Sequence, residues 1–212
     1  MTDIWSTRAR LYRESEAHRE GPDLDLLVEW AFGAETALDV ATGGGHVARR
    51  LREAGIQVVT CDPAPGMKPD VICRAEDLPF ADQSFDVVAC RVAAHHFPDP
   101  GAAVREMARV ARFNVLIVDN LFLDDRAEEG DRLRDPSHVR NYTAGEWKAF
   151  LEGARLVVGD VRFFDKPIEL QPWLDRAGCT GAEAERVEAL LMERIHDGWV
   201  TLDRIAVKAI KA

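Results

Sequence analysis

The stretch LDVATGGGHVARRL, at residues 38–51, decides the fold of this chain. Its first part belongs to a short apolar run at residues 37–41, which is typical of a buried strand. Three consecutive glycines at residues 43–45 come next, and residues 46–54 then place apolar side chains on one helical face. The stretch therefore predicts a strand, a tight glycine turn and a helix, which together begin an α/β fold.

The segments on both sides of this stretch continue the pattern. Residues 1–35 are mostly helical in pattern. Further strands are expected at residues 56–61, 70–73, 84–90 and 113–118, with a helix at residues 102–111. Strands that alternate with helices in units of this size predict a parallel sheet with helices on both faces.

The C-terminal third has a different character. Residues 124–142 are highly charged and predict a loop or lid, and the spacing of Thr143 and Glu146 predicts a capping box that begins a helix. The remaining expected elements are the helix at 143–153, a strand at 156–164, a helical segment at 168–197 with the apolar stripe Leu190, Leu191 and Ile195, and an antiparallel last strand at 199–210.

Length and composition limit the class of protein. A chain of 212 residues suits one domain, and its 27 basic and 37 acidic residues give a formal net charge of −10. This charge argues against DNA or RNA as the main partner, because a protein that binds phosphate backbones needs a basic face.

Four cysteines without a C-x-x-C motif are expected to be free thiols in a reducing compartment. Without a signal peptide or a membrane-length apolar segment, the protein is expected to be soluble and cytoplasmic.

The glycine turn fits two ligand-binding templates. One is the G-x-G-x-x-A turn of dinucleotide-binding folds, and the other is the D-x-x-x-G-x-G loop of S-adenosylmethionine (SAM) binders, beginning at Asp39. In both, Asp62 at the end of the second strand is placed to accept hydrogen bonds from ribose hydroxyls. Asp39 favours the second template, because a carboxylate suits a cationic sulfonium better than a pyrophosphate. A turn without a ligand, and an Asp39 that only accepts from turn amides, are the alternatives.

Four segments, in this order, resemble the class I SAM-dependent methyltransferases, and within them the methyltransferase type 11 group, which includes enzymes similar to those of ubiquinone and menaquinone biosynthesis. They are LDVATGGGHVA (38–48), the strand-end Asp62, AEDLPFADQSFDVV (75–88) and CRVAAHHFPDPGAAVREMARV (90–110). The resemblance covers about residues 24–122 and reaches more loosely to residues 135–147. It implies a Rossmann-like seven-stranded, mostly parallel sheet with helices on both faces and an antiparallel last strand.

The resemblance also implies where SAM lies. Gly43 and Gly45 approach the methionine part, Asp62 takes the ribose, Ala75 and Glu76 lie beside the adenine, and Arg91 flanks the sulfonium. The full set of expected cofactor-binding residues is Asp39, Ala41, Thr42, Gly43, Gly45, Asp62, Pro63, Ala75, Glu76, Asp77 and Arg91.

Two departures from the family pattern stand out. Relatives commonly carry Asp where this chain has Arg74, which can only donate hydrogen bonds, so Asp77 or a backbone carbonyl is expected to replace the contact to the adenine amino group. The usual helix between the second and third strands is also missing, because residues 63–69 are rich in proline. The missing helix leaves one sheet face thinly covered, which would expose the cofactor or favour a homodimer.

The candidate catalytic group is a histidine held by a carboxylate. His95 and His96 follow the fourth strand, and Asp119 ends the neighbouring fifth strand. An oxygen nucleophile must lose its proton before it takes a methyl group, and histidine suits that task. Some small-molecule O-methyltransferases with a similar His-His motif use such a pair. The alternative is that one histidine packs structurally and the other caps a loop.

Residues on the N-terminal helices and the lid are the candidate substrate contacts. They are Tyr12, His18, His138, Arg140 and Tyr142, with Arg134 or Arg140 as a clamp for an acidic group. Solvated lid charges are the alternative. No group of His, Asp and Glu has metal-ligand spacing, apart from the adjacent histidines, so no metal is expected.

The sequence therefore predicts one domain over residues 1–212. Residues 1–35 would be a helical lid, 36–122 the SAM-binding core, 123–197 a lid, helix, strand and small helical cap, and 198–212 the final strand. The predicted function is transfer of a methyl group from SAM to a small molecule, with O-methylation preferred. A protein of this fold that binds SAM or S-adenosylhomocysteine (SAH) without catalysis is the first alternative, and a nucleotide-dependent oxidoreductase the second.

Overall fold

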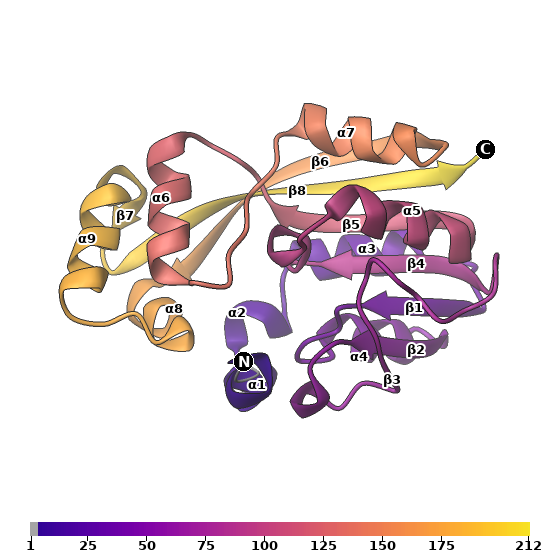
Figure 1. The fold of residues 1–212 in the computed structure, drawn as a ribbon, viewed down its shortest axis with the longest axis horizontal. Helices are drawn as coiled ribbons and strands as arrows, with labels where there is room; N and C mark the ends of the chain where they lie inside the picture. The colour runs from indigo at the N-terminus through magenta and orange to yellow at the C-terminus, as the bar shows by residue number, and fades with distance from the viewer. Residues whose placement is uncertain (1–3) are drawn as a thin grey trace.

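An eight-stranded sheet forms the centre of the molecule in the computed structural model, which describes residues 4–212 (Figure 1). Its strands are β1 (Thr36–Val40), β2 (Gln57–Asp62), β3 (Val71–Ile72), β4 (Phe85–Arg91), β5 (Ala111–Asn120), β6 (Leu156–Glu169), β7 (Ile195–His196) and β8 (Trp199–Lys211). The strand order is β3-β2-β1-β4-β5-β8-β6, and β7 pairs with β8 outside this path. Strands β1 to β5 are parallel to one another, whereas β8 is antiparallel to β5 and β6. The predicted mostly parallel sheet with an antiparallel last strand is confirmed, with one additional short strand.

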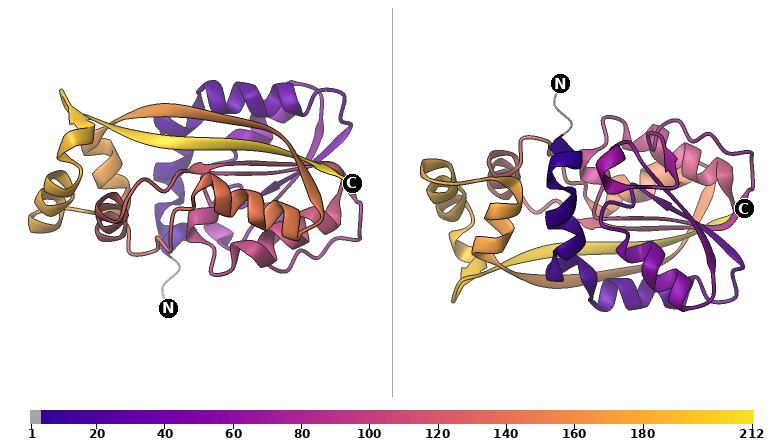
Figure 2. Two further views of the ribbon diagram at one scale, coloured as in Figure 1. Left: turned by 90° about the horizontal axis from the view of Figure 1, so that it is seen from above. Right: turned by 90° about the horizontal axis from the view of Figure 1, so that it is seen from below.

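Helices cover both faces of this sheet (Figure 2). The helices, with the short 3-10 turns labelled η, are α1 (Ile4–Glu14), α2 (Glu16–Arg19), α3 (Pro22–Trp30), α4 (His46–Glu53), η1 (Pro65–Met67), η2 (Ala94–His96), α5 (Pro100–Val110), α6 (Asp125–Arg134), α7 (Ala144–Gly153), α8 (Leu170–Ala177), α9 (Ala182–Leu190) and η3 (Met192–Arg194). The apolar side chains of α3 and α4 form one core cluster against the sheet, and those of α5 and α7 form another. The α/β layering expected from the alternating sequence pattern is confirmed.

Local sequence signals explain several boundaries. Every residue of β4 is buried, as its continuous apolar run predicts for a central parallel strand. The capping box predicted at the start of α7 is present, because Thr143 and Glu146 each satisfy a backbone N–H of the other. Asp99 caps α5, where its side chain accepts from the backbone of Ala102 and Pro100 occupies the first helical position.

The segment between β2 and β3 contains only the turn η1, so the predicted loss of the usual helix there is confirmed. Helix α1 packs against this turn. The backbone N–H of Gly66 donates to Oγ of Ser6 over 2.7 Å, and Arg13 donates to the carbonyl of Gly66 over 2.9 Å. A Cβ atom on Gly66 would lie 2.5 Å from the Cα of Ser6, so glycine permits this close approach. The N-terminal helix therefore packs on the segment that stands in place of the usual helix.

The C-terminal third differs from the prediction in three places. Residues 124–142 were expected to be a loop or lid, but they contain helix α6. The strand expected at 156–164 extends to Glu169, because β6 pairs with β8 along its whole length. Residues 168–197 were expected to be helical throughout, but they include the end of β6 and the strand β7 besides α8 and α9.

We call α6, α8, α9 and the distal ends of β6 and β8 the cap. They share a core cluster of their own, separate from the two clusters of the main sheet. Leu191 and Ile195 of the expected apolar stripe belong to this cluster, but Leu190 does not. In Figure 1 the cap forms the end of the molecule beyond the C-terminal ends of β1 and β4. Among residues 4–212, no helix has the length and apolar character needed to cross a membrane.

Candidate active site

A cavity of about 320 Å³ lies between the sheet and the cap. Its wall includes residues at the carboxyl ends of β1, β2 and β4, residues of α1, and residues of α8. In open α/β sheets this edge is where ligands bind, because the loops that follow the strands converge there. The predicted residues that line it are Tyr12, His18, Asp39, Ala41, Thr42, Gly43, Asp62, Pro63, Ala75, Glu76, Arg91, His95 and His96.

The glycine turn and Asp62 form one end of this cavity. Gly43 and Gly45 adopt left-handed backbone conformations, with φ of 50° and 78°, that glycine takes without strain. The backbone N–H of Gly43 donates to Oδ2 of Asp62 over 3.0 Å, and that of Ala64 donates to Oδ1 over 2.9 Å. These bonds fix the orientation of the carboxylate in the cavity wall, and a carboxylate can accept several hydrogen bonds.

Asp39 lies beneath the same turn. Its Oδ2 accepts from the hydroxyl of Thr42 over 2.6 Å and from the backbone N–H of Ala48 over 3.1 Å. Burial raises the pKa of Asp39 to about 6, and the bonds from Thr42 and Ala48 oppose this rise. Asp39 therefore stabilises the turn through these hydrogen bonds, which was the alternative given for it in the sequence. It also lines the cavity.

Glu76 brings an unsatisfied polar atom to the cavity. Its Oε1 is buried and has no hydrogen-bond partner among the described residues, while its Oε2 lies 3.4 Å from Nε of Arg74. Buried oxygens without a partner are rare, so this atom is suited to accept from a bound ligand. Asp77 is exposed and lies outside the cavity wall. The structure therefore places Glu76, but not Asp77, in the cavity wall.

Arg91 is buried in an ion-pair network that the sequence did not reveal. Its Nε donates to Oδ2 of Asp23 over 2.7 Å, and its Nη1 donates to the carbonyl of His18 over 3.0 Å. Arg204 donates to the same Asp23 oxygen over 3.0 Å. Arg91 and Arg204 both line the cavity, so two cations share a single carboxylate there.

His95 is held at two points by one carboxylate. Its ring Nδ1 lies 2.5 Å from Oδ1 of Asp119, and its backbone N–H donates to Oδ2 over 2.9 Å. A carboxylate can only accept here, so Nδ1 carries a proton, and in the neutral imidazole Nε2 holds the lone pair. Asp119 is fully buried and is not part of the cavity wall, whereas His95 is. The pair predicted from neighbouring strand ends is therefore brought together.

The ring of His96, like that of His95, is oriented by a hydrogen bond from its Nδ1. Its Nδ1 lies 3.0 Å from the carbonyl oxygen of Ser137, which can only accept, so Nε2 again keeps the lone pair. Burial lowers the pKa of His96 well below its usual value of 6.5, and the neighbouring His95 adds to this effect. The ring also contacts Trp5 edge-on, at 4.6 Å between ring centres. His96 is therefore a neutral imidazole in the cavity wall.

The predicted substrate contacts separate into two groups. Tyr12 and His18 line the cavity, with their ring centres 5.5 Å apart. His138, Arg140 and Tyr142 lie outside its wall. Arg140 pairs with Glu146 at 2.9 Å, which favours the expected alternative of lid charges with no ligand.

Tyr142 belongs to the main core. It packs edge-on against Trp147 and Phe150 and is only 6% exposed. His138 is directed to Glu128, and its ring centre lies 5.5 Å from that of His95. The structure therefore places His138 next to the candidate base without giving it access to the cavity.

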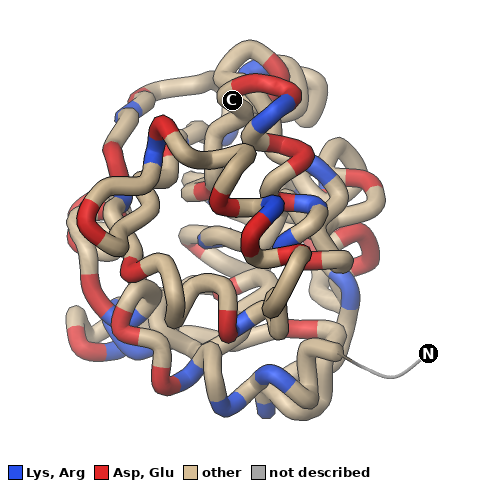
Figure 3. Tube along the Cα trace, turned by 90° about the vertical axis from the view of Figure 1, so that its left-hand side faces the viewer, with Lys and Arg blue, Asp and Glu red and all other residues tan. Residues whose placement is uncertain are grey.

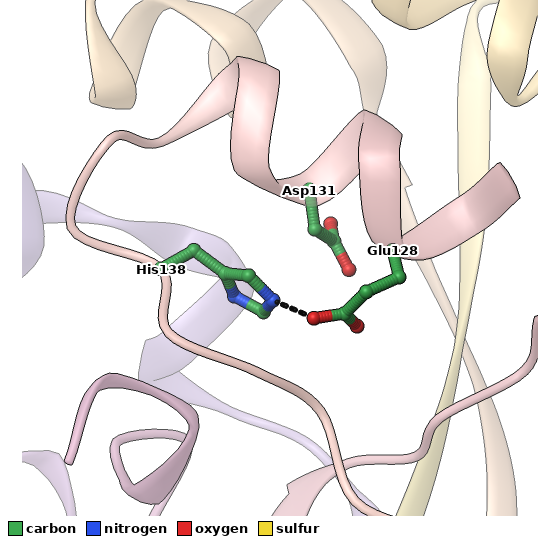
Figure 4. A group of neighbouring side chains, drawn as sticks. All are labelled: Glu128, Asp131 and His138. Carbon is green, nitrogen blue, oxygen red and sulfur yellow. Dashed lines mark hydrogen bonds and ion pairs between the residues drawn. The ribbon is translucent and has the colours of Figure 1, made fainter. Parts of the chain in front are cut away.

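Figure 4 shows a cluster that the sequence spacing did not reveal, formed by Glu128, Asp131 and His138. Their ligand atoms lie within 4.8 Å of one another, and Nε2 of His138 is 2.9 Å from Oε1 of Glu128. Asn141 donates to both carboxylates, and Arg132 lies 3.4 Å from Glu128. These contacts already satisfy the carboxylates, so we assign no metal to the cluster.

Several residues of the cavity wall were not among the predicted site residues. Trp5, Trp173 and Arg176 line it, and Arg134, which was considered as a clamp for an acidic group, lies over the ring of Trp173 at 4.3 Å. Trp173 and Arg176 are three residues apart on α8, so they share one face of that helix, and this spacing is the signal that could have found them.

The fold and the site together define a class of protein. A Rossmann-like sheet with an antiparallel last strand, a glycine turn after β1 and an acid at the end of β2 are the features of a class I SAM-dependent methyltransferase. Comparisons with known proteins lead to the same class. The profile described as methyltransferase domain matches residues 38–118.

Two proteins of Bacillus species resemble this chain over most of its length. The uncharacterised methyltransferase YcgJ of Bacillus subtilis is 34% identical over 206 residues, which span 86% of this chain and 81% of YcgJ. The crystal structure of YcgJ gives a TM-score of 0.78 at 29% identity and covers 89% of this chain and 97% of that one. BH2331 of Bacillus halodurans C-125 gives the same TM-score at 30% identity and covers 90% of this chain and 99% of that one. A demethylmenaquinone methyltransferase of Beutenbergia cavernae is 38% identical over 95 residues, 39% of this chain and 40% of that enzyme.

The chain belongs to the family of SAM-dependent methyltransferases. SAM is therefore its cofactor, and the residues at the glycine-turn end of the cavity fit it. The left-handed glycines leave room for a ligand, Asp62 is oriented for hydroxyl groups, and the buried Oε1 of Glu76 has no partner among the described residues. Membership of this family favours an enzyme over a protein that binds SAM without catalysis and over a nucleotide-dependent oxidoreductase.

Proposed function

We propose that this enzyme transfers a methyl group from SAM to an oxygen atom of a small-molecule acceptor, with His95 as the general base. The observation that carries the proposal is the contact between Nδ1 of His95 and Asp119 at 2.5 Å. It fixes the proton on Nδ1, so the basic Nε2 is the ring nitrogen left for an acceptor hydroxyl. His95 lines the same cavity as the glycine turn and Asp62.

Each group of residues has its own task in this proposal. The sulfonium supplies an already activated methyl group, so the protein contributes mainly position and proton transfer. We propose that Gly43, Asp62 and Glu76 hold the cofactor, and that Nε2 of His95 takes the proton of the acceptor hydroxyl. Asp119 keeps the ring in one tautomer and stabilises the imidazolium that forms.

The shape and charge of the chain support a small acceptor. The cavity is enclosed by α1 and α8 and has a volume of about 320 Å³, which is the scale of a small-molecule site. The relative from Beutenbergia cavernae is named for its action on demethylmenaquinone, itself a small molecule. Acidic and basic positions are interspersed along the chain trace on the cap side in Figure 3, and this distribution, with the net charge of −10, supports the exclusion of nucleic acid. A cytoplasmic location is proposed from the four free cysteines.

A two-step experiment tests this function. Calorimetry with SAM, SAH and NAD should show binding of the two adenosyl ligands and none of NAD. The protein is then incubated with methyl-tritiated SAM and a small-molecule extract of its source organism, and label in new compounds is counted. Label should appear with the native protein and fall at least a hundredfold with His95→Gln. Label that persists at full rate in His95→Gln would show that another group handles the proton.

A further inference from the structure

Charge divides the cavity into two ends. The carboxylates of Asp39, Asp62 and Glu76 line the end formed by the glycine turn. Arg134 and Arg176 line the opposite end, formed by the cap. The first end suits the cationic sulfonium and the hydroxyl groups of the cofactor. The cap end has the opposite sign. The carboxylate of the cofactor belongs to its methionine part, which is expected at the glycine turn, so it does not account for cations at the cap end.

Arg176 is the unusual residue of the cap end. It lies on α8, is only 8% exposed and lines the cavity, yet among residues 4–212 it has neither an ion pair nor a hydrogen-bond acceptor. Burial lowers its pKa to about 10, and Arg134 adds to this effect. A buried guanidinium without a partner costs free energy, so such groups are normally paired in the folded state.

The neighbouring arginines differ from Arg176 because each has a carboxylate. Arg8 lies 3.0 Å and Arg134 lies 3.8 Å from oxygens of Asp135. Arg91 and Arg204 share Asp23, at 2.7 and 3.0 Å. Arg8 and Arg134 thus share one carboxylate and Arg91 and Arg204 share another, whereas Arg176 has none within the described part of the chain. Arg176 therefore faces the cavity without a counter-charge of its own.

We propose that Arg176, assisted by Arg134, binds an anionic group of the acceptor, so that the substrates of this enzyme are small anions bearing a carboxylate or a phosphate. This inference rests on the proposed function, because it assigns the cap end of the cavity to the acceptor. Guanidinium groups bind both anions through paired N–H donors. Trp5, Tyr12 and Trp173 line the same cavity and offer apolar surface to the body of such an acceptor.

Fractionation of the acceptor pool tests the charge of the substrate. A small-molecule extract of the source organism is passed over an anion-exchange resin at neutral pH, and each fraction is incubated with the protein and methyl-tritiated SAM. The methyl-accepting compounds should be retained by the resin and elute with salt. Prior phosphatase treatment should abolish their retention if the group is a phosphate and leave it unchanged if the group is a carboxylate.

Substitution of Arg176 tests the site. Arg176→Gln should raise the KM for the retained acceptor about ten- to hundredfold, which corresponds to the loss of one or two charged hydrogen bonds. Affinity for SAH should stay within twofold, and Arg176→Lys should recover part of the loss. The matched control is Arg186→Gln, which changes an exposed arginine of the cap that pairs with Glu129. It should keep the native KM.

The outcomes separate this inference from the proposed function. Methyl acceptance found only in the unretained, neutral or cationic fractions would overturn the anionic substrate while leaving O-methyl transfer in place. An unchanged KM in Arg176→Gln would likewise overturn the role of this residue. If no fraction accepts a methyl group, the proposed small-molecule function itself fails.

Discussion

Both oxygens of the Asp119 carboxylate bind His95: Oδ1 lies 2.5 Å from the ring Nδ1, and Oδ2 accepts the backbone N–H over 2.9 Å. The two residues come from neighbouring segments, since Asp119 is on β5 and His95 is in the turn after β4. The carboxylate is completely buried, whereas the imidazole reaches the cavity. This arrangement fixes the position and the tautomer of the ring before any acceptor binds.

Removal of either member of this pair should reduce the rate of methyl transfer. His95→Gln and Asp119→Asn are each expected to lower kcat by about 10²- to 10⁴-fold, because the acceptor hydroxyl loses its base or the base loses its tautomer. Affinity for SAH, measured by calorimetry, should change less than threefold. His196→Gln, which alters an exposed histidine of the cap, is the control. Equal rates in all three variants would rule out the pair as the proton acceptor.

Glu76 should contribute to cofactor affinity without affecting the chemical step. Its buried Oε1 lacks a partner among the described residues, so a bound adenosyl group would satisfy it. Glu76→Gln is expected to weaken SAH binding about tenfold and to leave kcat at saturating SAM unchanged. The same titration with Asp77→Asn decides between the two acids. A loss in Asp77→Asn alone would assign the contact to Asp77.

Cofactor affinity should depend on pH through Asp39. Burial raises the pKa of this carboxyl to about 6, so it is ionised above that pH and protonated below it. A cationic ligand favours the ionised form, and binding should therefore release a proton and weaken as the pH falls from 7 to 5. SAM affinity measured across this range should lose most of that dependence in Asp39→Asn. The same slope in both proteins would show that Asp39 does not sense the cofactor charge.

Stability should fall on mild acidification because two buried histidines resist protonation. Burial lowers the pKa of His18 and His96 well below 6.5, so below that pH the unfolded chain binds more protons than the folded protein. Each group contributes a slope of up to about 1.4 kcal/mol per pH unit. Asp39 acts in the opposite direction below about pH 6, because its folded pKa is raised.

The net effect is a decrease in the free energy of unfolding of about 1–2 kcal/mol between pH 7 and pH 5.5. Urea denaturation at both values measures it. In a His18→Asn/His96→Asn variant the decrease should be smaller, because neither side chain titrates. An identical decrease in the native protein and the variant would contradict the assignment to these rings.

The glycine turn should be sensitive to added volume at Gly44. A Cβ atom there would lie 2.8 Å from the backbone oxygen of Tyr12 and 2.7 Å from Nε2 of His46. Gly44→Ala should therefore displace α1 and destabilise the protein by about 1–3 kcal/mol. Gly153→Ala is the control, because a Cβ on that helical glycine meets nothing within 4 Å, and its stability should be unchanged or slightly higher. Equal melting temperatures would show that α1 adapts without cost.

The core of the fold and most of the cofactor end could be predicted from the sequence because their signals are local. The glycine turn, the strand-end Asp62 and the buried run of β4 each lie within a few residues. The pairing of His95 with Asp119 could be predicted because parallel strands bring their carboxyl ends to one edge.

The rest of the site could not be predicted, because its contacts join distant parts of the chain. Asp23 lies 68 residues from Arg91 and 181 from Arg204, and no periodicity encodes that contact. The role proposed for Arg176 rests on the lack of a carboxylate near it in the described structure. The sequence alone does not show which side chains surround this residue. Tyr142 and Arg140 were assigned to the substrate by their position in a charged segment, but core packing and an ion pair occupy them.

The most direct measurement of the central claim is the position of the transferred methyl group. The protein is incubated with SAM carrying a carbon-13 methyl group and the acceptor fraction, and the product is examined by carbon-13 NMR. We expect a methyl resonance in the range of methyl ethers or esters, which is present with the native protein and absent with His95→Gln. A methyl group bonded to carbon or nitrogen, or a product formed at the native rate without His95, would contradict it.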